Sequence, residues 1–135
     1  MNELQHILTH TRTVAVVGLS PKPHRDSYEV AQYLQSRGWR IIPVNPLAKV
    51  DTILGEKVYA SLSDAAAHEA IDLVDCFRNS NDIPPIVDET IALGLGAVWM
   101  QLGIAHPQAA AKARAAGLRV VENRCLKIDL ARHLA

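Results

Sequence analysis

A short run of basic and polar residues follows the first apolar segment of the chain. The apolar run Val14–Val17 stops at Gly18. Lys22, His24 and Arg25 come next, and a helical pattern begins directly after them. Glycine lets the backbone approach a ligand, a helix start offers unpaired N–H groups, and Lys and Arg bind phosphate oxygens. This order predicts a phosphate-binding loop for a nucleotide-like ligand; the alternative is a surface loop with scattered charges.

The end of the second apolar segment argues against plain NAD as that ligand. It ends in Asn45-Pro46, where a domain that binds NAD usually places an Asp or Glu for the ribose hydroxyls. Ser20 and Pro21 also stand where the dinucleotide fingerprint needs further glycines. A neutral end suits a ribose that carries a phosphate. An oxidoreductase of the NADP type therefore stays an alternative, since the cationic loop could hold a 2′-phosphate.

Polar and aromatic side chains follow the later apolar segments. Phe77, the only phenylalanine, comes at the end of the third segment, where it could wall an adenine or cap the core. Arg78 could bind a second anion or pair with Asp82. Asn123 and Arg124 follow the fifth segment, and unaided each would be an ordinary surface or capping residue.

Groups that could catalyse a reaction are present but scattered. The six histidines have no identifiable Ser or Cys partner, and Cys76 and Cys125 lack the CxxC spacing of a zinc or redox site. Cys125 would be a nucleophile only if its thiol were exposed and acidic; otherwise it is a packed thiol. Asp72 and Asp75 could be paired carboxylates, although strand-end caps or salt bridges are the usual outcome. We therefore expect no catalytic residue and no metal site.

Composition restricts the class of protein. The 135 residues include 14 basic and 14 acidic side chains, which argues against a nucleic-acid binder that works by bulk charge. No secretory signal pattern and no apolar run of membrane-spanning length is present. We expect a cytoplasmic protein that contacts neither nucleic acid nor membrane.

The elements that must position these residues alternate between strand and helix. Short apolar strands joined by helices predict one domain over residues 1–135, with about five strands in a doubly wound, Rossmann-like parallel sheet and helices on both faces. The loops that follow the strands then all face one site. Residues 47–55 are expected to be a loop, and the helix after Asp26 is expected to bury Tyr28, Ala31 and Leu34, with Val30 at the margin of that face. The expected strands are Thr13–Gly18, Arg40–Val44, Ile71–Phe77, Ala97–Leu102 and Arg119–Val121; the expected helices are Glu3–Thr9, Ser27–Ser36, one capped at Ser61–Asp64, one from Pro84-Pro85 to Leu93, Pro107–Ala116 and Leu126–Leu134.

Several motifs together carry a resemblance to a known family. They are Gly18–Pro23 with Arg25 and Ser27, Val44–Pro46, Asp75–Arg78, Val98–Gly103 and Asn123–Cys125. This set resembles the small stand-alone CoA-binding domain proteins, which are similar to the N-terminal CoA-binding domain of the succinyl-CoA synthetase alpha subunit. The resemblance covers about residues 5–134.

The resemblance implies a role for each motif. The nucleotide would lie across the strand ends, with Gly18, Ser20, Lys22, Arg25 and the neighbouring Ser27 at the phosphates, Asn45 and Pro46 at the adenosine, Phe77 and Arg78 at the adenine and diphosphate, and Gln101, Asn123 and Arg124 in the blocks that border the pantetheine path. In the synthetase the phosphorylated histidine belongs to a second domain. The resemblance therefore implies a protein that binds CoA or an acyl-CoA and catalyses no reaction by itself. A regulatory module that senses the ligand and binds a partner through its helices is a further alternative.

Overall fold

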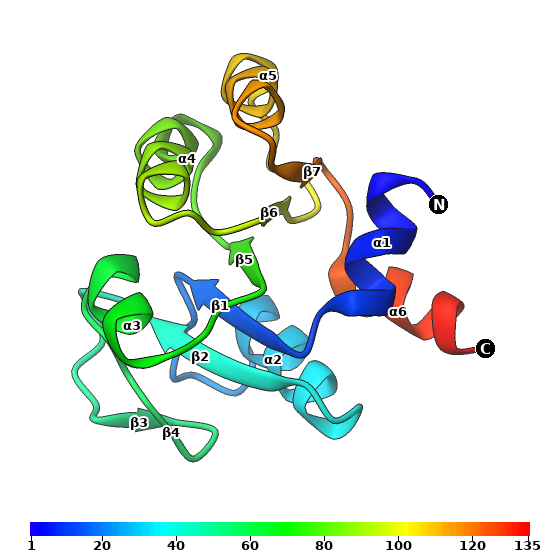
Figure 1. Ribbon diagram of the computed structural model, residues 1–135. Helices are drawn as coiled ribbons and strands as arrows, with labels where there is room; N and C mark the ends of the chain where they lie inside the picture. The colour runs from blue at the N-terminus through cyan, green and yellow to red at the C-terminus, as the bar shows by residue number, and fades with distance from the viewer.

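A parallel sheet of five strands forms the centre of the molecule (Figure 1). The computed structural model describes all residues from Met1 to Ala135. The sheet order is β2-β1-β5-β6-β7, and every neighbouring pair is parallel. The strands are β1 (Thr13–Val17), β2 (Arg40–Val44), β5 (Leu73–Cys76), β6 (Ala97–Met100) and β7 (Arg119–Val121). The five predicted strands are confirmed, each to within two residues at either end.

The direction of winding reverses beside β1. From β1 the chain first crosses to β2 at one edge and then returns to β5 on the other side of β1. This is the doubly wound order found in flavodoxin-like folds. The crevice for a ligand in such a sheet lies beyond the carboxyl ends of the strands at the reversal, which here are the ends of β1 and β5.

Helices cover both faces of the sheet, as predicted (Figure 1). Strand residues alternate between the two cores: Val16 and Trp99 pack on one side, and Ala15 and Val98 pack on the other. Burial on both faces explains why the strands are short apolar runs. The first face carries α1 (Glu3–His10), α2 (Asp26–Ser36) and α6 (Leu126–Leu134); the second carries α3 (Leu62–His68), α4 (Ile83–Ala92) and α5 (Pro107–Ala115).

Local signals set the helix starts. Ser61 caps α3 as expected, because its hydroxyl accepts the Asp64 N–H at 3.0 Å. The helix expected at Pro84-Pro85 begins one residue earlier, at Ile83, after a short 3-10 turn, η1 (Ser80–Asp82). Proline fits there because the first helical N–H groups have no partner within the helix.

One sequence expectation was wrong. Residues 47–55 do not form a plain loop, because β3 (Thr52–Ile53) and β4 (Glu56–Lys57) pair as a hairpin. Leu54 and Gly55 both have positive φ, which is the turn that joins two such strands. Strands of two residues are too short to give an alternating pattern in the sequence.

The buried face of α2 agrees with the expectation except at Tyr28. Val30, Ala31 and Leu34 are buried, whereas Tyr28 is half-buried. Ser27 is buried as well, because its hydroxyl accepts the Ser20 N–H at 3.0 Å.

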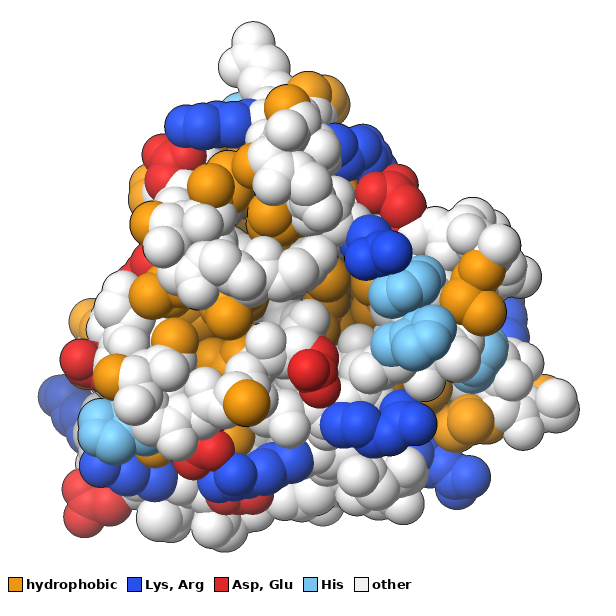
Figure 2. Space-filling view, in the orientation of Figure 1, with side chains coloured by type: hydrophobic (Ala, Val, Ile, Leu, Met, Phe, Trp, Pro, Cys, Tyr) orange, Lys and Arg blue, Asp and Glu red, His pale blue; other side chains and the backbone are white.

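The exposed charges form no single-sign surface on the face drawn in Figure 2. Lys and Arg side chains are interspersed there with Asp and Glu. This mixing matches the formal net charge of zero.

Candidate functional site

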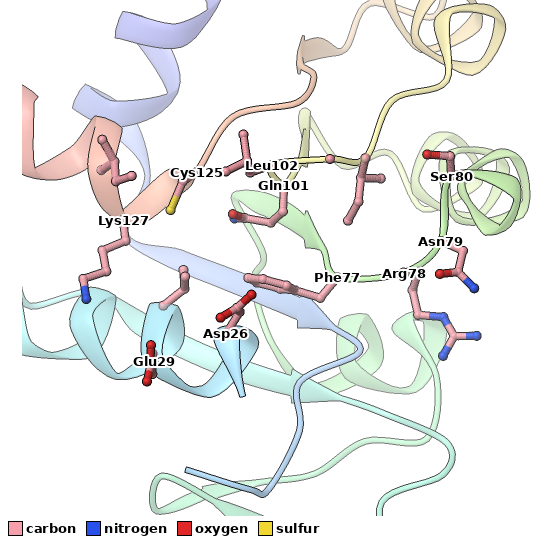
Figure 3. A pocket seen from close by; sticks show the side chains of 14 residues that line it. Asp26, Glu29, Phe77, Arg78, Asn79, Ser80, Gln101, Leu102, Cys125 and Lys127 are labelled. Carbon is pink, nitrogen blue, oxygen red and sulfur yellow. The ribbon is translucent and has the colours of Figure 1, made fainter. Parts of the chain in front are cut away.

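A pocket opens at the carboxyl end of the sheet, between the starts of α2 and α6 (Figure 3). Its volume is about 880 Å³, within the range of pockets that hold cofactors and drug-sized molecules. Four segments that lie far apart in the sequence form its walls. They are Asp26, Glu29 and Val30 of α2; Phe77, Arg78, Asn79 and Ser80 after β5; Gln101, Leu102, Gly103 and Ile104 after β6; and Cys125, Lys127 and Ile128 around the start of α6.

Phe77 occupies the middle of the pocket wall. In Figure 3 its ring lies between Gln101 and Asp26. The side chain is partly buried and packs against the core that α2 and α6 share with the sheet. Phe77 thus packs against the core, as one of the two sequence interpretations expected, and also presents ring surface to the pocket.

Gly18 is required by a contact within the protein. Its φ is +90°, and a Cβ placed there would lie 2.3 Å from the Phe77 carbonyl oxygen. The space that a side chain would need is occupied by the end of β5. The glycine therefore sets how closely the chain after β1 approaches the chain after β5.

The loop between β1 and α2, residues 18–25, is shaped by its serines. The Ser20 N–H donates to the Ser27 hydroxyl, and the Ser20 hydroxyl accepts the Lys22 N–H at 3.1 Å. Lys22 and Arg25 are exposed, and neither forms an ion pair. No side chain caps the start of α2. The loop thus offers two unpaired cations beside uncapped helix N–H groups.

Asn45 ties the end of β2 to this loop. Its Nδ2 donates to the Leu19 carbonyl oxygen at 2.9 Å, and its Oδ1 accepts the Leu47 N–H at 2.9 Å. Asn45 thus joins the end of β2 to the loop after β1 by hydrogen bonds, whereas Pro46 is exposed beside it.

Arg78 and Arg124 have different surroundings. Arg78 lines the pocket and lies 3.4 Å from Asp82, and both side chains are about two-fifths exposed. Arg124 makes two bonds to the buried Asp129, of 2.7 and 2.8 Å, which raise the pKa of Arg124. Asn123 has φ +55° and accepts the Gly103 N–H at 2.7 Å. Asn123 and Arg124 thus shape the turn into α6, and neither lines the pocket.

The structure brings the predicted site residues to one edge of the sheet in two groups. Phe77, Arg78 and Gln101 line the pocket itself. The other predicted residues lie outside the lining. Gly18, Ser20, Lys22, Arg25 and Ser27 belong to the loop after β1 and the start of α2, Asn45 and Pro46 follow β2, and Asn123 and Arg124 follow β7.

Sequence reasoning missed much of the lining from the two helices. Glu29 and Val30 lie in the first turns of α2, and Lys127 and Ile128 lie in the first turn of α6. The available signal was the alternation of strands and helices. It places the helix starts that follow the strands at the same end of the sheet as the strand-end loops.

The two aspartates of the third predicted strand have separate roles. Asp72 lies at the opposite end of the sheet, where its Oδ2 accepts the N–H groups of Arg12 and Thr13 at 3.0 and 2.9 Å. The expected strand-end cap is thus confirmed for Asp72. Asp75 forms neither a cap nor an ion pair, and its carboxyl group is fully buried beneath Gln101. Burial raises its pKa to about 7, although the Gln101 hydrogen bond opposes the shift.

Comparison with known proteins identifies the family. The family described as "CoA binding domain" matches residues 12–131. The chain belongs to the CoA-binding domain family. The resemblance carried by the sequence motifs is thereby confirmed.

Similar chains extend over almost the full length of this one. An uncharacterized Bacillus subtilis protein, YneT, is 34% identical over 126 residues, covering 93% of this chain and 90% of its own. A solved structure from Thermus thermophilus is 36% identical with a TM-score of 0.90, covering 98% of this chain and 99% of that one. This chain also matches 27% of a dinucleotide-forming acetyl-coenzyme A synthetase from Ca. Korarchaeum cryptofilum. That match covers 87% of this chain at 22% identity and a TM-score of 0.73, and it shows a shared fold.

None of the helices has the length and apolar character needed to cross a membrane. The structure also contains no group of three or more His, Cys, Asp or Glu side chains arranged to hold a metal ion.

Proposed function

We propose that this protein binds CoA or an acyl-CoA in the cytoplasm, as a binding or regulatory module that catalyses no reaction by itself. Family membership over residues 12–131 carries the proposal. The position of the pocket supports it, because the pocket lies beyond the carboxyl ends of the strands, where doubly wound sheets bind nucleotides.

The charges around the site fit the phosphates of such a ligand. Lys22 and Arg25 are exposed and unpaired beside the uncapped start of α2. A helix start and two cations together form a favourable place for a diphosphate or a ribose 3′-phosphate. In this proposal Asn45 and Pro46 border the ribose side of the adenosine.

The pocket fits the remainder of the ligand. Phe77 offers an aromatic surface for the adenine, and Arg78 offers a cation for the diphosphate. From there the pantetheine would extend past Gln101 towards Leu102 and Ile128, whose side chains are 68% and 47% exposed. These apolar rims would lose water on contact with the ligand, which favours binding.

The surroundings of the pocket thiol support the proposal that the protein catalyses no reaction. Cys125 is the cysteine that lines the pocket, and no histidine lines it. A thiol nucleophile is usually activated by an adjacent base or by a cation that lowers its pKa. The pocket supplies the cation of Lys127 but no histidine, so in this proposal the site holds a thioester without cleaving it.

Ligand binding can be tested on the freshly purified protein. Native mass spectrometry should show a retained mass that matches CoA, and added CoA should raise the melting temperature. Stabilisation follows RT ln(1 + [L]/Kd), about 2.7 kcal/mol at a hundredfold excess over Kd. Dephospho-CoA should stabilise the protein less, since it lacks the 3′-phosphate. Strong stabilisation by NADP with no effect of CoA would refute the proposal and favour the oxidoreductase alternative.

A further inference from the structure

Asp75 and Gln101 form a buried polar pair directly behind the pocket. The Gln101 Nε2 donates to Asp75 Oδ1 at 2.6 Å, and Gln101 Oε1 accepts the Leu126 N–H at 3.3 Å. The two side chains are 0% and 3% exposed, yet Gln101 is part of the pocket wall. Because both ends of its amide are engaged, the orientation of Gln101 depends on Asp75 below it and on the start of α6 above it.

The second oxygen of Asp75 has no partner. Oδ2 is buried and makes no hydrogen bond. A buried carboxylate with one donor is costly, because ionised carboxylates need several donors or a cation when they leave water. A protonated Asp75 keeps the Gln101 bond and avoids the buried charge.

No cation lies close enough to balance Asp75. Its strand neighbours are Val16 and Trp99. Burial raises the pKa of Asp75 and the Gln101 hydrogen bond opposes that shift. Burial also raises the pKa of the Cys76 thiol, next in the chain, and the neighbouring Asp75 adds to this effect. The charged and titratable groups on the helices that pack over this face lie elsewhere. Glu3 pairs with Arg114, Asp129 pairs with Arg124, and His6 and His10 stack on each other. Asp26, Glu29, Cys125 and Lys127 lie at the pocket, Tyr33 lies beneath Lys127, Tyr28 is half-buried, and Arg132 and His133 are exposed.

We propose that Asp75 is a positioning residue for the ligand pocket, and that its protonated form is the one that binds an anionic ligand. The inference rests on the proposed function, with CoA as the ligand. A polyanion at the pocket raises the cost of a buried carboxylate behind Gln101, so binding favours uptake of a proton by Asp75. By linkage, affinity then falls as Asp75 ionises.

The test compares CoA affinity of the wild type and Asp75→Asn by isothermal titration at about pH 6 and about pH 8. Asn mimics the neutral acid and keeps an oxygen for Gln101. The wild type should lose roughly fivefold more affinity than Asp75→Asn over this interval, the lower end of typical coupling between sites. The phosphates of CoA titrate equally in both experiments, so the difference reports Asp75. Asp88→Asn, an exposed carboxylate on α4 that pairs with Lys112, is the matched control and should follow the wild type.

Asp75→Ala separates positioning from protonation. It removes the acceptor for Gln101, so CoA should bind more weakly at both pH values, whereas Asp75→Asn should retain wild-type affinity at the lower one. Equal pH dependence in the wild type and Asp75→Asn would overturn the inference and leave CoA binding intact. A wild type that binds no CoA at any pH would instead overturn the proposed function.

A spectroscopic measurement on the wild type covers the case in which Asp75→Asn fails to fold. Addition of CoA slightly above neutral pH should increase the infrared C=O band of a protonated carboxyl group, because binding favours that form. An unchanged band at saturating CoA would overturn the inference.

Discussion

At the scale of single residues, Gly18 is the position where the fold tolerates no side chain. A Cβ there would lie 2.3 Å from the Phe77 carbonyl oxygen, and φ is +90°. We predict that Gly18→Ala lowers the free energy of unfolding by about 2–4 kcal/mol, since backbone strain and a main-chain clash add. Urea denaturation would measure the loss.

Gly117 provides the matched control for this substitution. Its φ is +92°, but nothing lies within 4 Å of an added Cβ. Gly117→Ala should therefore cost only the strain of the left-handed conformation, about 1–2 kcal/mol. Equal losses at the two positions would show that the contact with Phe77 is unimportant.

Asp75 gives the protein a stability that depends on pH. Burial raises the pKa of Asp75 from 3.8 to about 7. At pH values between these two, the folded state keeps a proton on Asp75 that the unfolded state has released. The contribution of Asp75 is therefore complete below about pH 4, decreases as pH rises, and is lost above about pH 7. We predict that the wild type loses roughly 2–3 kcal/mol more than Asp75→Asn between about pH 5 and about pH 8, as urea unfolding would show. Parallel pH profiles of the two proteins would contradict the assignment.

At the scale of elements, the loop between β1 and α2 carries the free cations of the site. We predict that Lys22→Ala and Arg25→Ala each weaken CoA binding by about 1.5–3 kcal/mol, because each removes a charge-assisted hydrogen bond to phosphate. If both serve one phosphate, the two losses will not add. Added salt should weaken CoA binding more in the wild type than in the double mutant. Salt screens the attraction between the phosphates and the two cations, which the double mutant lacks.

Lys112→Ala is the control for these loop variants. Lys112 lies on α5, on the other face of the sheet, and pairs with Asp88 at 2.6 Å. Its loss should leave CoA affinity unchanged in isothermal titration. Wild-type affinity in Lys22→Ala and Arg25→Ala would assign the phosphates to other cations, such as Arg78, which lines the pocket.

The same elements show what the sequence could predict. The five central strands are buried on both faces, so each appears as an apolar run that ends at a turn residue. The hairpin of β3 and β4 was missed because its strands have two residues each and only Ile53 is buried. The roles of Asn45 and Asn123 were also out of reach, because their partners Leu19 and Gly103 are distant in the sequence.

At the scale of the whole molecule, the sequence could predict that the site lies at the carboxyl end of the sheet, but it could not predict the pocket. Parallel strands joined by helices place their carboxyl ends together, which brought Phe77, Arg78 and Gln101 to one edge. The buried pair of Asp75 and Gln101 depends on strand order, because it joins β5 to the end of β6. Residue types alone did not reveal that contact.

The pocket that holds Cys125 is lined by no histidine, which leads to a prediction for the intact protein. Purified protein should release no free thiol from acyl-CoA thioesters above the uncatalysed rate, because the pocket lacks a histidine to activate a nucleophile. Cys125→Ser should keep CoA affinity within about twofold, since exchanging one sulfur for one oxygen changes the size of the side chain little. A thioester activity that disappears in Cys125→Ser would refute the view of a binding module.

The two helical walls of the pocket have a consequence for folding kinetics. α2 begins at Asp26 and α6 at Leu126, so the pocket exists only after segments about a hundred residues apart have closed on each other. If this long-range closure follows the rate-limiting step, a ligand that needs both walls cannot recognise the transition state. Added CoA would then leave the refolding rate constant unchanged and slow unfolding alone. The bound protein would gain lifetime, and so resistance to proteolysis, without folding any faster.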